Sequence, residues 1–203
     1  MNDHSKTLRL TRLALLAAIV LVLAYTPLGY IHSGPLAITP IMIPVTVGAI
    51  LLGPTEGAVL GGIFGLTSFS TCFGADAFGT TLLAINPVFT FLVCVGARVL
   101  AGWLPAVIFK ALHRPERLVL ANAAFGVAAL AGPVLNTVFF MGGLVLFFYR
   151  TEFIQSYVTA LGAANPFVFV LLFVGVQGAV EAAAGFVVSG VLSRAVYPVL
   201  HRG

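Results

Sequence analysis

LVLANAAFGVAALAGPVLNTVFFMGGLVLFF, the stretch from Leu118 to Phe148, contains no charged side chain. A helix that spans a membrane needs about 20 mainly apolar residues, so this stretch is long enough to cross a bilayer. At about 1.5 Å per residue, a straight helix of this length would reach about 46 Å, whereas the hydrocarbon core is about 30 Å thick. Pro133 lies near its middle and removes one backbone hydrogen bond. We therefore expect a kink, a tilt or a protruding end to absorb the excess length.

The sequence on either side of this stretch is also poor in charge. Of the 203 residues, 60% are hydrophobic and 8% are charged, whereas a soluble domain is about 25% charged. This composition excludes an ordinary soluble enzyme, a disordered regulator and a nucleic-acid binder. We predict an all-α integral membrane protein with one domain, residues 1–203, formed by a bundle of six transmembrane helices. The predicted spans cover residues 8–26, 36–52, 55–70, 82–104, 118–148 and 166–196.

Basic residues beside the predicted spans indicate how the chain is oriented in the membrane. Eight of them fall on one side: Lys6, Arg9, Arg12, Lys110, Arg114, Arg117, Arg194 and Arg202. Arg150 alone flanks the other side. Because cytoplasmic loops carry the excess of Lys and Arg, both termini are predicted to be cytoplasmic. The first span follows basic residues, as in a signal peptide, but no A-x-A cleavage pattern follows it, so we expect a retained helix.

The outer connections predicted from these spans are longer than the inner turns. They cover residues 28–35, 70–81 and 149–166. In the last of them, apolar residues at helical spacing predict a short amphipathic helix. Connections of this kind suit a lid over an outward-facing cavity, and plain connecting loops are the alternative.

Small residues four positions apart form faces on which helices in lipid pack closely. Two such faces are expected to pack within the protein's own bundle: Gly57, Gly61 and Gly65 on the third span, and Gly175, Ala179 and Ala183 on the sixth. A further pair, Ala14 and Ala18, lies near the cytoplasmic end of the first span. This pair is a candidate face for docking a separate helix.

Two charged residues lie deep inside predicted spans. Each costs about 2.5–3.5 kcal/mol on insertion scales, so each is a candidate functional residue. Arg98 in the fourth span and Glu181 in the sixth lie at similar depth, about 22–24 Å below the outer face. An ion pair between them would offset much of this cost. The alternatives are that one of them contacts a substrate, or that Arg98 extends to the inner interface.

Uncharged polar residues in the spans enlarge this candidate set. Asn136 and Thr137 lie on the fifth span, and Asn86 lies near the outer start of the fourth. Gln177 lies one turn before Glu181 and on the same face. These side chains offer hydrogen-bond donors and acceptors to a polar solute, and bonding between helices is the alternative. The candidate substrate-binding residues are Asn86, Asn136, Thr137, Gln177, Glu181 and Arg98.

The sequence carries no pattern for catalysis or for cofactor binding. No Ser-His-Asp constellation, Walker A motif or G-x-G-x-x-G motif is present, so we predict no catalytic residue, metal or cofactor, and transport energy would come from a partner. Cys94 lies in an apolar run, so we expect no disulfide with Cys72. Two other functions stay open: an intramembrane enzyme that uses Glu181 and Arg98, and a membrane scaffold without a ligand.

Three stretches resemble a known family: Ile38–Phe69, Asn86–Gly102 and Gly132–Phe148. Together with the chain length and the six predicted spans, they make the protein similar to the substrate-binding S components of energy-coupling factor (ECF) transporters. The similarity is greatest to the pantothenate type. Ala14-x-x-x-Ala18 on the first span matches the docking motif of that family.

The resemblance implies that the protein is not an enzyme but binds a small water-soluble vitamin in an outward-facing cavity. Pantothenate is the first expectation, and another vitamin such as riboflavin is the alternative. Asn136 and the face of Gln177 and Glu181 would line the cavity. The resemblance also implies docking through Ala14 and Ala18 on a transmembrane coupling subunit, which two cytoplasmic ATPase subunits drive, in the cell membrane of a prokaryote.

Overall fold

The computed structural model describes residues 3–27, 29, 31–32, 37–114, 116 and 118–200. These residues are almost entirely helical, apart from a short antiparallel hairpin in which Ile31 pairs with Ile38. The elements in chain order are α1 (Asp3–Ala24), β1 (Ile31–His32), β2 (Ala37–Ile38), α2 (Met42–Leu52), α3 (Pro54–Thr71), α4 (Ala77–Ile85), α5 (Pro87–Phe91), the π-helix η1 (Leu92–Gly96), α6 (Ala97–Leu112), α7 (Leu118–Phe148), α8 (Glu152–Ala160), α9 (Pro166–Ala184), the π-helix η2 (Gly185–Ser189) and α10 (Gly190–Leu200).

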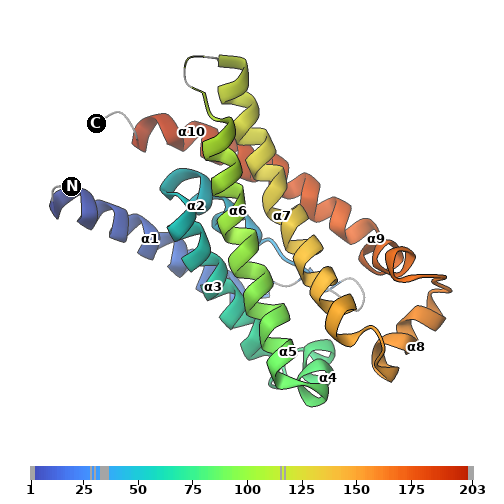
Figure 1. Cartoon of the computed structure of the whole chain (residues 1–203). Coiled ribbons are helices and arrows are strands. Elements are labelled where there is room, and N and C mark those ends of the chain that lie inside the picture. The colour runs from blue at the N-terminus through green and yellow to red at the C-terminus, as the bar shows by residue number, and fades with distance from the viewer. Residues whose placement is uncertain are drawn as a thin grey trace.

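The helices form a bundle with two distinct ends (Figure 1). Both chain ends, the last turn of α6 and the first turn of α7 lie at one end, toward the upper left of the view. Helices α4, α5 and α8 lie at the opposite end. The two ends of the chain therefore share one side of the bundle. Which side faces the cytoplasm stays a prediction.

Four helical stretches of the described chain are long and apolar enough to cross a membrane: Lys6–Ala24, Pro87–Leu112, Val119–Phe148 and Gln177–Leu200. They make the protein an all-helical membrane protein, as predicted. The second predicted span contains α2, an apolar helix of only 11 residues. The third contains α3, which has 18 residues but is less apolar than the four stretches above. The count of six spans therefore stays a prediction.

Two of the predicted spans are interrupted in the structure. The fourth was expected to begin at Leu82, but the helix ends at Ile85 and a new one begins at Pro87. Asn86 between them is extended, because a residue before proline is disfavoured from helical geometry. In the sixth, Gly175 has a φ of 50°, a conformation that favours glycine and breaks α9. The fifth span matches α7 and continues through Pro133.

The glycine face of α3 packs inside the bundle, as predicted. A Cβ atom at Gly57 would lie 2.3 Å from the carbonyl oxygen of Gly102, and one at Gly61 would lie 2.2 Å from that of Arg98. At Gly65 it would lie 2.7 Å from the Cα atom of Val95. The absence of side chains therefore lets the backbone of α3 contact the backbones of η1 and α6 directly.

The prediction for the second small-residue face is wrong. Gly175, Ala179 and Ala183 are exposed on the outside of the bundle. The same helical stretch meets α7 through another glycine, because a Cβ atom at Gly185 would lie 2.6 Å from the ring of Pro133. Small-residue spacing identifies a face on which close packing is possible, but it does not show which face points inward.

An ion pair joins α1 to α3 at the end of the bundle that carries the chain termini. Arg9 Nε lies 2.6 Å from Glu56 Oε1, and Arg9 also donates to the carbonyl oxygen of Leu52 at 3.4 Å. Glu56 is buried, whereas the Arg9 side chain is 44% exposed. The pair holds the first half of α1 against the start of α3.

Candidate functional site

A cavity of about 650 Å³ lies between α1, α3, α4, α6, α7 and α9. It reaches the last residues of α1 and α3, so it lies toward the end of the bundle opposite to the chain termini. Pockets for small molecules typically measure about 300–1,000 Å³. Its lining is largely apolar, and its polar side chains include Thr39, Asp76, Arg98, Asn136, Gln177 and Glu181.

Arg98 is buried in the cavity wall, with 7% of its surface exposed. It lies in the first turn of α6, directly after η1, and its Nη1 donates to the carbonyl oxygen of Val93 at 2.9 Å. Its guanidinium carbon lies 4.4 Å from the centre of the Phe140 ring, a cation–π distance. Its Nε finds no partner in the described part of the chain. Because a buried guanidinium needs an anionic or polar partner, this side of the cavity suits an anion.

Glu181 lies on α9 and is held by the residue that follows the hairpin. Its Oε1 accepts hydrogen bonds from the backbone nitrogen of Thr39 at 2.5 Å and from the Thr39 hydroxyl at 3.1 Å. Glu181 and Arg98 form no ion pair among the described residues, since each has different partners. Arg98 also does not extend to the inner interface, because it is buried. Contact of either residue with a solute stays a prediction.

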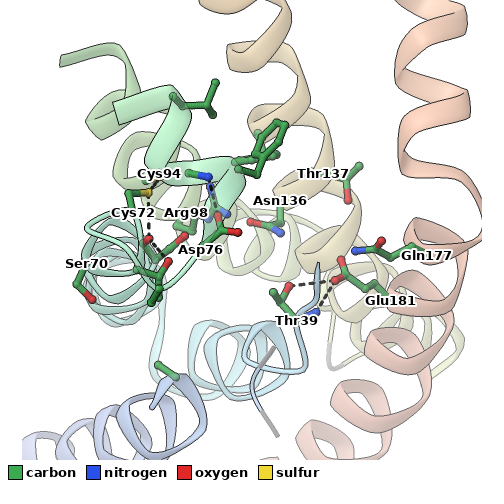
Figure 2. A pocket seen from close by; sticks show the side chains of 18 of the residues that line it. Thr39, Ser70, Cys72, Asp76, Cys94, Arg98, Asn136, Thr137, Gln177 and Glu181 are labelled. Carbon is green, nitrogen blue, oxygen red and sulfur yellow. Dashed lines mark hydrogen bonds between the residues drawn. The ribbon is translucent and has the colours of Figure 1, made fainter. Parts of the chain in front are cut away.

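Asn136 lies between the two charged side chains in the view of Figure 2. It is 6% exposed, lines the cavity, and its Oδ1 has no partner among the described residues. Thr137 and Gln177 line the same cavity. Gln177 lies beside Glu181 on α9 (Figure 2). The structure therefore brings together five of the six predicted binding residues, and their contact with a solute stays a prediction.

Asn86, the sixth predicted binding residue, does not line the cavity. Its Oδ1 accepts from the backbone nitrogen of Phe89 at 3.1 Å, which caps the first turn of α5. Pro87 occupies the first position of that helix, where its missing N–H is not needed. An Asn-Pro pair at a helix start is therefore explained by capping, and its polarity does not indicate a ligand here.

The structure adds cavity residues that sequence reasoning missed. Asp76 lies in the second outer connection, and its carboxylate accepts from the backbone nitrogen of Gly79 at 2.7 Å to cap α4. An Asp before an apolar helical stretch is a capping signal that could have located this helix start. Thr39 lies outside the helices, and nothing in its sequence surroundings points to Glu181. Cys72 and Cys94 also line the cavity, and both are free thiols.

The predicted docking pair lies on the outer face of α1. Ala14 and Ala18 are both exposed, whereas Val20 on the opposite side of the helix is fully buried in the bundle. This small-residue face is open to a second helix, as the docking hypothesis requires. Docking itself stays a prediction.

Comparison with known proteins places these features in a family. Residues 8–193 match the family model described as ECF transporter, substrate-specific component. The chain is also 29% identical over 158 residues to the pantothenic acid transporter PanT of Lactococcus lactis subsp. cremoris, an alignment that covers 72% of this chain and 77% of that protein. The apolar helices are those of a membrane protein, as this family implies. The chain belongs to the substrate-specific components of ECF transporters.

Proposed function

We propose that this protein captures pantothenate from outside a prokaryotic cell and delivers it as the S component of an ATP-driven ECF transporter. The observation that carries this proposal is the buried Arg98 with its unpartnered Nε in the cavity wall. Pantothenate has a carboxylate at one end, an amide in the middle and two hydroxyl groups at the other end. The similarity to a pantothenic acid transporter supports the same ligand.

The lining of the cavity matches this order of chemical groups. We place the carboxylate at Arg98, where it receives the charge-assisted hydrogen bonds that a buried anion requires. The amide N–H then lies near Asn136 Oδ1, which lacks a partner among the described residues. The hydroxyl groups extend toward Gln177 and Glu181, whose oxygens accept hydrogen bonds. Riboflavin has no carboxylate, so it would leave Arg98 without a counter-charge.

The two ends of the bundle support an outward-facing cavity. The basic residues of the first half of α1 and Lys110 in the last turn of α6 lie toward the end that carries the chain termini, and the cavity lies toward the other end. By the distribution of positive charge, the end with the termini is cytoplasmic. The exposed pair Ala14 and Ala18 then offers the coupling subunit a close-packing face, and two ATPase subunits would supply the energy.

Binding to the purified full chain tests the ligand. Calorimetry should detect pantothenate binding to the native protein, and Arg98→Gln should weaken it by about 10- to 100-fold, since hydrogen bonds to charged groups contribute about 1.5–3 kcal/mol. Arg150→Gln is the matched control, because Arg150 is exposed and does not line the cavity. Its affinity should be unchanged.

A ligand analogue distinguishes loss of the carboxylate contact from general damage to the cavity in the Arg98→Gln variant. Pantothenol carries a hydroxyl group in place of the carboxylate, so the native protein should bind it more weakly than pantothenate. Arg98→Gln should abolish this difference between the two ligands. An Arg98→Gln protein that is folded by thermal unfolding and still prefers pantothenate would contradict the assignment of the carboxylate.

A further inference from the structure

The two cysteines of the chain lie next to each other in the cavity wall. Cys72 Sγ and Cys94 Sγ are 3.9 Å apart, although the residues are 22 positions apart in the sequence. Both are free thiols, both line the cavity, and their residues are 2% and 5% exposed. The sequence did not predict that the two sulfurs lie side by side, and the close packing of α3 on η1 brings them together as free thiols.

The pair lies where three elements, α3, α4 and η1, meet in the wall of the cavity. Cys72 is the cap residue that directly follows α3, and Cys94 lies in the middle of η1. Gly79 at the start of α4 leaves room for the first sulfur, since a Cβ atom there would lie 2.6 Å from Cys72 Sγ. Cys94 lies one helical turn before Arg98, in the same wall (Figure 2). A bond between the sulfurs would tie the α3–α4 connection to the segment that positions Arg98.

We propose that Cys72 and Cys94 form a modification site, at which a small disulfide that enters the cavity oxidises the two thiols to an intramolecular disulfide. One cysteine, as the thiolate, attacks a sulfur of the reagent, forms a mixed disulfide and releases one reagent thiol. The second cysteine then attacks its neighbour's sulfur and releases the second reagent thiol. The two cysteines lose two protons and two electrons, and the two sulfurs of the reagent gain them.

The geometry favours one disulfide between Cys72 and Cys94 over a separate mixed disulfide on each cysteine. A disulfide bond is about 2.05 Å long, so the two sulfurs must approach each other by roughly 1.9 Å. The attacking sulfur is already adjacent, so the second step is intramolecular and outpaces the encounter with another reagent molecule. If the cavity opens to the exterior, as proposed above, it faces the compartment in which disulfides persist.

Mass spectrometry of the purified full chain tests this site. After treatment with 2-hydroxyethyl disulfide, the peptides that contain Cys72 and Cys94 should be joined, the intact mass should fall by two hydrogen atoms, and a maleimide should find no free thiol. A reducing agent should reverse each change. The oxidised protein should also unfold at a higher temperature, because the bond restricts the unfolded chain.

Single-cysteine variants distinguish a disulfide between the two cysteines from reaction of one cysteine with the reagent alone. In Cys72→Ser, the remaining cysteine should stop at the mixed disulfide, and the unfolding temperature should not rise. Two stable mixed disulfides on the native protein would overturn the proposal, as would thiols that react only after denaturation. Both results come from the native chain alone, and neither depends on vitamin binding, so failure of pantothenate to bind would not affect them.

Discussion

The contact between α3 and the start of α6 allows a sharp test of the packing, because two adjacent glycines differ only in what lies opposite. A Cβ atom at Gly61 would lie 2.2 Å from the carbonyl oxygen of Arg98, and the next closest atom is also backbone. No rotamer change can relieve that overlap, so Gly61→Ala must move α3. A Cβ atom at Gly62 would meet Val99 Cγ2 at 3.6 Å, an ordinary contact.

The expected difference follows from these distances. Overpacking costs about 1–3 kcal/mol, and a backbone overlap of this depth lies toward the upper end. Replacing a helical glycine by alanine contributes roughly 1 kcal/mol of stability in return. Gly61→Ala should therefore destabilise by about 2 kcal/mol, whereas Gly62→Ala should stabilise by up to about 1 kcal/mol. A difference of about 3 kcal/mol corresponds to roughly 6–12 °C in unfolding temperature for a chain of this size.

Thermal unfolding of the two variants in the same detergent measures this difference. Gly61→Ala should also weaken ligand binding, because it moves the segment that holds Arg98, and Gly62→Ala should leave binding unchanged. Equal shifts for the two variants, or a higher unfolding temperature for Gly61→Ala, would show that α3 does not contact α6 backbone to backbone. The reasoning for the position of Arg98 would then fail as well.

Three further predictions follow from individual side chains. Asn136→Leu should raise the unfolding temperature, because it removes an unpartnered buried Oδ1, yet it should weaken ligand binding in calorimetry. Asn86→Ala should instead lose about 1 kcal/mol of stability, because it removes the cap of α5, and should keep the native affinity. Arg9→Gln should destabilise by about 1 kcal/mol or less because the pair with Glu56 is partly exposed, and salt should reduce the difference from the native protein in unfolding assays. The double variant Ala14→Trp with Ala18→Trp should abolish uptake of labelled pantothenate by cells but not its binding. The control, Leu15→Trp with Ile19→Trp, changes exposed positions that are already bulky and should leave both uptake and binding intact. Uptake by the first double variant would exclude docking on this face.

Much of the helical structure could be predicted from local sequence. The bounds of α7 follow from a long, mainly apolar stretch without a charged residue, and the apolar spacing between Phe153 and Leu161 indicates α8. Bilayer thickness and helical rise relate span length directly to residue count, and so these predictions need no knowledge of neighbouring helices. The breaks at Asn86 and Gly175 also depend on local backbone chemistry, although their effect on the spans was not anticipated.

The composition of the cavity could be predicted in part, because a polar residue deep in a span is costly and so indicates a special environment. Arg98, Asn136 and Glu181 were found in this way, and all three line the cavity. Asn86 shows the limit of the argument, since an asparagine at a helix start has a sufficient local role as a cap.

By itself, the sequence determined that this chain is a helical membrane protein and where α7 begins and ends, and it identified Arg98, Asn136 and Glu181 as candidate residues. Only the tertiary structure decided that Glu181 binds Thr39 and forms no ion pair with Arg98, that Cys72 lies beside Cys94, and that one small-residue face points inward while another is exposed. The physical reason is that rise and periodicity are properties of one helix, whereas the rotation of each helix about its own axis is set by packing against helices that are distant in sequence.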